Sequence, residues 1–209
     1  MPLHEFIMQR DIINIAGYKI LEKISLGSHS SAFRGIRLSD NMPVIIKAPT
    51  AKFISLNLIN RFRSEFNIGS QFDSEFIIKY YSLEPFQNGL AIISEDFGGV
   101  KLSDLIPEQG MDVATFLDVA IQITEGLRVI HGENVIHKDL KPGNIAISPE
   151  NKIIKYLDFG ISSQAELESF QGIDLTASGG TLEYISPEQT GRTNRLIDYR
   201  SDLYSLGMR

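Results

Sequence analysis

The pattern of apolar and polar positions in the first hundred residues is mainly that of β-strands. Short apolar or alternating runs, bounded by turn-forming residues, occupy positions 18–24, 31–37, 44–47, 77–83 and 90–94. Small residues from Gly27 onward, an Asn41-Met42-Pro43 turn and an Asn88-Gly89 turn signal separate the runs. The pattern therefore predicts a β-meander that grows into one sheet.

One segment of this first part has helical periodicity instead. Between residues 56 and 70, Ile59, Phe62 and Phe66 recur at helical spacing with charged residues between them. We therefore expect one helix to pack on the sheet.

The periodicity changes after residue 99. Glu95-Asp96-Phe97-Gly98-Gly99 follows a buried strand, and its paired glycines suit a hinge. Beyond it lies one long helical stripe, with Asp112 as the expected N-cap and Gly132 as the expected stop. The stripe consists of Val113, Phe116, Leu117, Ala120, Ile121, Thr124, Leu127 and Ile130. The chain is thus predicted to be α+β, with a β-rich lobe, a hinge and a mainly helical lobe.

Composition narrows the class of protein. At 209 residues with 43% hydrophobic content the chain can bury a substantial core. A net charge of −6 argues against a nucleic-acid partner, and the lack of cysteine excludes disulfides and thiol chemistry. Four scattered histidines make no zinc pattern. No apolar run approaches the roughly 20 residues that span a bilayer, so we expect no membrane insertion and a cytoplasmic location.

The segment His137-Lys138-Asp139-Leu140-Lys141-Pro142-Gly143-Asn144 carries the strongest chemical signal. It places a carboxylate, a cation and a carboxamide at spacings that suit phosphoryl transfer from a magnesium nucleotide. Asp158-Phe159-Gly160 follows the next apolar run and offers a second oxygen ligand. Two metal-directed side chains are therefore expected at neighbouring strand ends.

From Ala16 to the last residue the chain resembles the protein-kinase family. The resemblance implies that Lys47, in Val44-Ile45-Ile46-Lys47, contacts the α- and β-phosphates and pairs with Glu65. It implies that Asp139 is the catalytic base and that Lys141 contacts the γ-phosphate. Asn144 and Asp158 would be the ligands of Mg²⁺, or of Mn²⁺ in its place. Considered without the motif, Lys47 also suits a solvated strand lysine, and Glu65 a structural ion pair.

The same resemblance implies an ATP site. Only Gly27 remains of the family's three-glycine loop, and we expect serine hydroxyls and backbone N–H groups to cradle the phosphates there. Ser94 would guard a roomy back pocket, while His137 and Phe159 would pack in the spine that links the lobes. The implied nucleotide-binding positions are Gly27, Ser28, Ser30, Ala32, Ile45, Lys47, Ser94, Glu95, Phe97 and Ile145.

The last motifs concern the acceptor. Residues 179–188 resemble the end of an activation segment, in which Thr181 would bond the catalytic loop and Ser186 replaces the usual alanine. Together with Lys141, this form implies a serine/threonine rather than a tyrosine kinase, with proteins as substrates. Residues 198–207 resemble the start of the central helix, where Asp202 anchors the catalytic loop.

The closer likeness is to kinase modules that open large bacterial signalling proteins containing a histidine kinase, so further signalling domains are expected if the natural chain continues. The resemblance divides the chain into an N-terminal extension (1–16), an N-lobe (17–95), a hinge (96–99) and a partial C-lobe (100–209).

Two features of the sequence favour a second hypothesis, a pseudokinase-like or truncated module that binds nucleotide or a partner without turnover. One is the glycine loop, of which only Gly27 remains. The other is that the chain stops where kinases usually continue, which predicts that Glu188 lacks its partner and that the isolated chain is marginally stable. Gly69 is also expected to leave the spine a side chain short, which would favour an inactive or loosely assembled resting state. A small-molecule phosphotransferase ranks below both hypotheses.

Overall fold

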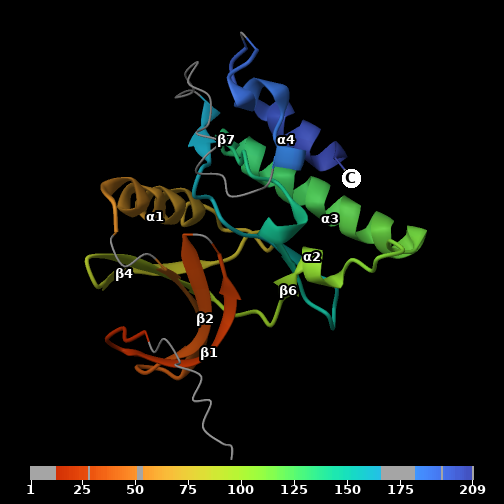
Figure 1. Cartoon of the computed structure of the whole chain (residues 1–209). Helices are drawn as coiled ribbons and strands as arrows, with labels where there is room; N and C mark the ends of the chain where they lie inside the picture. Colours follow the sequence, from red (N-terminus) through yellow and green to blue (C-terminus); the bar gives the residue numbers. More distant parts are fainter. Residues whose placement is uncertain (1–12, 28, 51–53, 166–181, 194, 209) are drawn as a thin grey trace, which may run out of the picture.

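The protein is described by a computed structural model that covers residues 13–27, 29–50, 54–165, 182–193 and 195–208. Its first part is a five-stranded antiparallel sheet with the order β1-β2-β3-β5-β4. The strands are β1 (Tyr18–Leu26), β2 (Ser30–Arg37), β3 (Met42–Pro49), β4 (Tyr80–Phe86) and β5 (Gly89–Glu95). Figure 1 shows this sheet below the helices α3 and α4. The predicted single sheet is confirmed.

Helix α1 (Leu56–Gly69) is the predicted helix of the first part. The Ser55 hydroxyl caps it by accepting a hydrogen bond from the Leu58 N–H at 3.2 Å. Its inner face buries Phe62, Glu65 and Ile68 against β4 and β5. A glutamate on the buried face of an amphipathic helix requires a partner, which the site supplies.

The second part is mainly helical and loop-rich. Its elements are β6 (Val100–Lys101), α2 (Leu102–Leu105), α3 (Val113–Gly132), β7 (Val135–Ile136), η1 (Pro142–Asn144), β8 (Ile145–Ile147), β9 (Ile154–Tyr156), β10 (Ser163–Gln164), η3 (Leu182–Tyr184), η4 (Pro187–Thr190) and α4 (Tyr199–Gly207). Strands β6, β8 and β9 form one small sheet, and β10 pairs with β7. The α+β architecture is as predicted. Among the described residues, no helix is both long and apolar enough to cross a bilayer.

Two strand boundaries differ from the prediction. The run 77–83 was expected to be one strand, but β4 begins only at Tyr80, because the backbone of Ile77 and Ile78 pairs with Tyr156 of the second part. The β4–β5 turn consists of Gln87 and Asn88 rather than Asn88-Gly89, since Phe86 pairs with Gly89. Pairing between the two parts of the molecule overrides the local signal in the first case.

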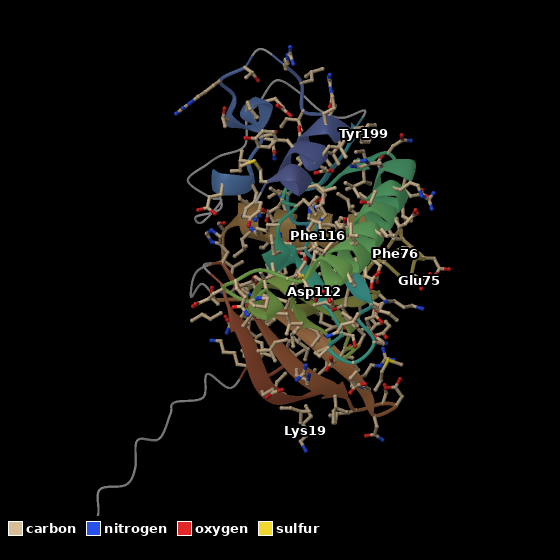
Figure 2. The ribbon with its side chains drawn as sticks, turned by 90° about the vertical axis from the view of Figure 1, so that its right-hand side faces the viewer. Lys19, Glu75, Phe76, Asp112, Phe116 and Tyr199 are labelled. Atoms are coloured by element: carbon tan, nitrogen blue, oxygen red, sulfur yellow. The ribbon has the colours of Figure 1, made fainter. Side chains whose placement is uncertain are left out.

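The predicted apolar stripe of α3 is wrong in its first half. Val113, Phe116 and Ile121 are 74%, 57% and 60% exposed, and the buried face consists of Val119, Ile123, Gly126, Leu127 and Ile130. Figure 2 labels Asp112 and Phe116 along this helix. Tyr156 sets the rotation, because its ring lies against Gly126 and its hydroxyl donates to the Ile123 carbonyl at 2.6 Å. The predicted limits of α3 are confirmed, with Asp112 capping through the Thr115 N–H.

One hydrophobic core runs through both parts. It joins Phe62 and Ile77 of the first part to Leu127, Tyr156 and Phe159 of the second. A second cluster, around Phe33 and Ile46, lies within the first part. The shared core holds the sheet and the helical part in a fixed relation on either side of the cleft described next.

Candidate functional site

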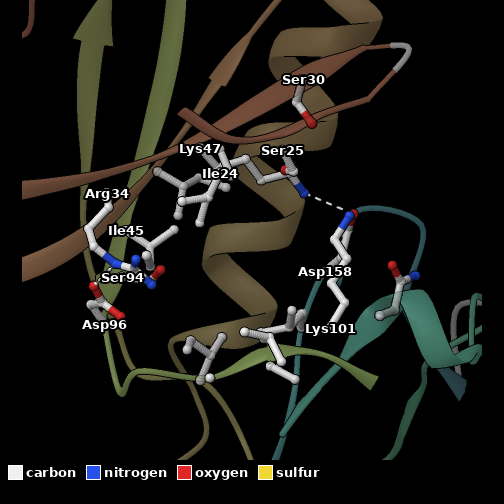
Figure 3. A pocket seen from close by; sticks show the side chains of 18 of the residues that line it. Ile24, Ser25, Ser30, Arg34, Ile45, Lys47, Ser94, Asp96, Lys101 and Asp158 are labelled. Carbon is white, nitrogen blue, oxygen red and sulfur yellow. Dashed lines mark hydrogen bonds and ion pairs between the residues drawn. The ribbon is translucent and has the colours of Figure 1, made fainter. Parts of the chain in front are cut away.

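A cleft of about 630 Å³ lies between the sheet and the loops of the second part. It is lined by strands β1, β2, β3 and β5, by the 96–99 connection, and by the turns around η1 and after β9. Figure 3 shows Ser25 and Ser30 near Lys47, and Arg34 and Asp96 beside Ile45 and Ser94. The predicted residues that line it are Gly27, Ser30, Ala32, Ile45, Lys47, Glu65, Ser94, Glu95, Phe97, Asn144 and Asp158. Residues far apart in the sequence are thus gathered at one site.

The prediction that Ile145 belongs to the nucleotide-binding positions needs correction. Its side chain is 3% exposed within the core and does not line the cleft, whereas Ala146 and Leu157 do. Successive side chains of a strand point to opposite faces, so in β8 the neighbour Ala146 faces the cleft while Ile145 and Ile147 face the core.

A cation and two carboxylates meet at the back of the cleft. Lys47 Nζ lies 2.8 Å from both carboxylate oxygens of Glu65 and 2.9 Å from Asp158 Oδ2. The Lys47–Asp158 contact is drawn in Figure 3. β3 supplies the lysine, α1 the glutamate and the turn after β9 the aspartate. With both carboxylates ionised, the three groups together would carry one net negative charge.

One lysine cannot neutralise two carboxylates, and the pKa values of the two carboxyl groups shift in opposite directions. Burial and, after it, the charge of the nearby Asp158 raise the pKa of Glu65 to about 7, although Lys47 acts in the opposite direction. Burial acts in the same direction on Asp158, but the Lys47 charge and the Gly160 N–H hold the pKa of Asp158 well below its usual range. The exposures agree with this division, since the Glu65 side chain is 5% exposed and that of Asp158 is 37% exposed. Although burial alone would lower it, the two carboxylates raise the pKa of Lys47 above its ordinary value, so the lysine stays charged.

Asp139, Lys141 and Asn144 form a second compact group. Lys141 Nζ lies 2.9 Å from both Asp139 carboxylate oxygens, and Asn144 Nδ2 donates to Asp139 Oδ2 at 2.7 Å. Asn144 Nδ2 also donates to the Asp139 carbonyl at 2.8 Å. The Asp139 side chain is 29% exposed, so its carboxylate is oriented by neighbours but reachable from solvent.

The backbone of this loop is held by buried side chains. Asp202, which is fully buried, accepts hydrogen bonds from the N–H groups of His137 and Lys138 at 2.9 and 2.8 Å. The same carboxylate lies 2.9 Å from His131 Nε2, and Ser162 Oγ donates to the His137 carbonyl. The predicted anchoring of the loop by Asp202 is therefore present.

A family model described as the protein kinase domain matches residues 18–209. The chain belongs to the protein kinase domain family.

Several relatives are named serine/threonine-protein kinases. PknA of Corynebacterium glutamicum is 33% identical over 205 residues, covering 92% of this chain and 42% of the relative. Pkn3 of Myxococcus xanthus is 30% identical over 91% of this chain and 36% of the relative. PknL of Mycobacterium bovis is 29% identical over 91% of this chain and 47% of the relative. The chain spans less than half of the length of these relatives.

Aromatic rings connect the two parts of the kinase domain behind the cleft. Phe159 stacks on Phe72 with a centroid distance of 5.3 Å and contacts Tyr80 and His137 at 6.4 and 5.1 Å. The expectation that Gly69 leaves this spine a side chain short is wrong. A Cβ at Gly69 would lie 2.6 Å from Tyr80 Cζ, so the Tyr80 ring already fills that space.

A further sequence prediction concerns Glu188 in the C-terminal segment. Glu188 was expected to lack a partner, but Ser201 Oγ donates to its carboxylate at 2.5 Å. Burial alone would raise the pKa of Glu188, but this hydrogen bond helps to lower it below its ordinary value. Ser28 and Thr181 lie outside the described residues.

Some cleft residues were missed by the sequence analysis. Arg34 Nε lies 2.6 Å from Asp96 Oδ2 and its Nη1 lies 2.6 Å from Glu22 Oε1, which closes the outer side of the cleft. Lys101 and Asp104 line the same side. Strand alternation could have found Arg34, because it lies two residues after Ala32 and shares its face.

The donor set near Asp158 suits a magnesium ion. Carboxylate and carboxamide oxygens are hard ligands, and Mg²⁺ in nucleotide sites takes one or two protein ligands plus phosphate oxygens and water. Asn144 and Asp158 both line the cleft. Within the described ranges there is no cluster of three or more His, Cys, Asp or Glu side chains that could hold a metal ion.

Proposed function

We propose that this kinase domain transfers the γ-phosphoryl group of ATP to serine or threonine hydroxyls of protein substrates. The observation that carries the proposal is the Lys47–Glu65–Asp158 cluster, in which groups from three elements meet within 2.9 Å inside one cleft. A cation held between a buried carboxylate and a second, partly exposed one is typical of a functional site.

The residues of the cleft have distinct roles in this proposal. Ala32, Ile45 and Ala146 supply apolar contacts for the adenine ring, and the backbone of Glu95 and Phe97 offers it hydrogen bonds. Lys47 binds the α- and β-phosphate oxygens, with Glu65 fixing the ammonium in place. The small Ser94 side chain, 9% exposed, leaves room behind the base.

Asp139 acts on the acceptor. Its carboxylate accepts the hydroxyl proton as the substrate oxygen forms its bond to the γ-phosphorus, and the bond from that phosphorus to the β–γ bridging oxygen breaks to release ADP. Lys141, 2.9 Å from Asp139, places a positive charge beside the oxygens of the group being transferred. Magnesium held by Asn144 and Asp158 supplies the remaining neutralisation of phosphate charge when it is bound.

The function is tested by measuring radiolabel transfer from ATP to a generic protein substrate. We expect Asp139→Asn to lower kcat by about 10²–10⁴-fold while nucleotide binding persists, because only the proton acceptor is lost. Asp118→Asn makes the same chemical change at an exposed position of α3 and should leave the rate unchanged.

Transfer that does not depend on Asp139 would contradict the assigned base. Nucleotide binding by a wild-type chain that transfers no label would instead favour the second hypothesis, a binding module without turnover. Binding should weaken in Asp158→Asn under either hypothesis, which shows that the assay monitors the cleft.

A further inference from the structure

Lys138, the residue before Asp139, has an unusual backbone conformation. Lys138 has φ +66°, in the left-handed region that side-chain-bearing residues seldom adopt. Its N–H is bound by Asp202, and its carbonyl accepts a hydrogen bond from Gln189 Nε2 at 2.8 Å. Gln189 lies 51 residues further along the chain and is fully buried.

Only one orientation of the Gln189 amide satisfies its surroundings. Gln189 Oε1 accepts hydrogen bonds from the Ser186 backbone N–H at 3.1 Å and from Ser186 Oγ at 3.0 Å. A backbone N–H can only donate and the Lys138 carbonyl can only accept, so the amide nitrogen must face Lys138. The orientation is therefore decided by chemistry rather than by an arbitrary choice between oxygen and nitrogen.

Ser186 and Gln189 form the capping box of η4, so the contact is built into a rigid local unit. The serine that replaces the usual alanine supplies one of the two bonds that fix the glutamine. Loss of the amide donor would leave the Lys138 carbonyl without this partner next to the loop that carries Asp139. A small rotation of that peptide would move the Asp139 carboxylate away from the incoming hydroxyl.

We propose that Gln189 is a positioning residue for catalysis, which holds the Lys138 carbonyl and thereby orients the Asp139 carboxylate. The proposal rests on the proposed function, because it assumes that Asp139 is the base. Gln189 itself does not line the nucleotide cleft. Its effect should therefore fall on the transfer step and not on ATP binding.

The test compares two substitutions of Gln189 with the same substitutions of Gln122. Gln122 is a matched control because its amide also accepts from a backbone N–H and donates to a backbone carbonyl, those of Ile154 at 3.1 Å and Lys152 at 3.0 Å. Gln189→Met removes the donor with little change in size. Gln189→Glu keeps an acceptor for Ser186 but places a carboxylate oxygen against the Lys138 carbonyl.

We expect both Gln189 variants to lower the single-turnover rate of label transfer by about 10–100-fold, since displacements of about 1 Å cost that much. The KM for ATP should be unchanged, and the Gln122 variants should behave like the wild type. The variant Gln189→Glu has a further signature. Lowering the pH from about 8 to about 6 protonates its buried carboxyl, which restores a donor, so its rate relative to the wild type should rise. The relative rate of Gln189→Met should stay flat.

Rates of the Gln189 variants within about twofold of the Gln122 variants would overturn the proposal, since 1 Å of displacement should cost far more. It would also be overturned if transfer and ATP binding fell together, because the role would then be structural. The Asp139→Asn variant separates the positioning role of Gln189 from the proposed function. If Asp139→Asn abolishes transfer while the Gln189 variants keep the wild-type rate, only the positioning role fails. If transfer survives Asp139→Asn, the assigned base fails first.

Discussion

At the scale of single residues, the main feature of the site is that one lysine pairs with two carboxylates that differ in burial. Lys47 contacts both Glu65 and Asp158, yet the more buried glutamate has the higher pKa. Asp158 therefore keeps its charge, whereas burial raises the pKa of Glu65. The arrangement links the ionisation of the cleft to the stability of the whole domain.

The first prediction concerns the pH dependence of stability. Because the folded-state pKa of Glu65 is raised to about 7, its carboxyl favours folding fully below its unfolded pKa of about 4.5, and this contribution is lost as the pH rises through about 7. The free energy of unfolding of the wild type relative to Glu65→Gln should therefore fall by a few kcal/mol between about pH 4.5 and 7. Denaturant unfolding at a series of pH values measures it.

Glu75→Gln is the matched control, because Glu75 is an exposed glutamate, labelled in Figure 2. The control variant should parallel the wild type through this range. A wild-type stability that rises relative to Glu65→Gln over the same range would show that the ion pair with Lys47 outweighs burial.

Residue-level prediction from sequence succeeded where spacing along the chain carried the signal. Lys47, Asn144 and Asp158 all reach the cleft as expected. It failed for Ile145, where a shift of one residue reverses the face of a strand. Gln189 gave no signal, because a polar residue after a proline looks like surface until its distant partner Lys138 is known.

At the scale of elements, side-chain size at the contact between α1 and β4 sets how the spine is filled. Gly69 is the last residue of α1, and the Tyr80 ring of β4 lies where its side chain would be. Sequence spacing placed Gly69 on the spine but gave no measure of its neighbour's volume. The α3 stripe was misplaced for the same reason, since Tyr156 and Gly126 decide which face is buried.

The second prediction is that Gly69→Ala destabilises the domain by about 1–3 kcal/mol through overpacking against Tyr80. Helix propensity alone would predict a gain of about 0.5–1 kcal/mol, so the sign distinguishes the two effects. Gly132→Ala is the control, because Gly132 also ends a helix and an added Cβ would meet nothing within 4 Å. Thermal unfolding of the variants measures both.

A double variant tests the cause. Tyr80→Leu removes the ring that Gly69→Ala would strike, so the two changes together should cost less than the sum of the single costs. Additive costs would indicate that the backbone of α1, and not the Tyr80 ring, resists the substitution.

At the scale of the whole molecule, the two parts are joined at the side of the cleft as well as through the core. Glu95 Oε1 accepts a hydrogen bond from the Lys79 N–H at 2.8 Å and lies 2.7 Å from Lys155 Nζ, which ties the end of β5 to β9. The Tyr156 backbone bonds to Phe76 and Ile78 beside it. Periodicity predicted two parts and a hinge, but these ties depend on pairs too distant in sequence for periodicity to reveal. A ligand that fills the cleft therefore contacts both sides of one connected body.

The last prediction follows from that placement. In the proposed function ATP with magnesium would bridge Lys47 of the sheet and Asp158 of the second part, so at a concentration of 100 Kd it should stabilise the folded domain by about 2.7 kcal/mol. For a domain of this size that corresponds to a rise in Tm of about 5–10 °C. ATP with a chelator should give a smaller rise, and in Asp158→Asn the rises with and without magnesium should be alike. In the control variant Asp118→Asn, the rises in Tm with and without magnesium should equal those of the wild type. An equal rise in the wild type with and without magnesium would contradict a metal held by Asp158, and it would leave Lys47 as the group that carries nucleotide binding.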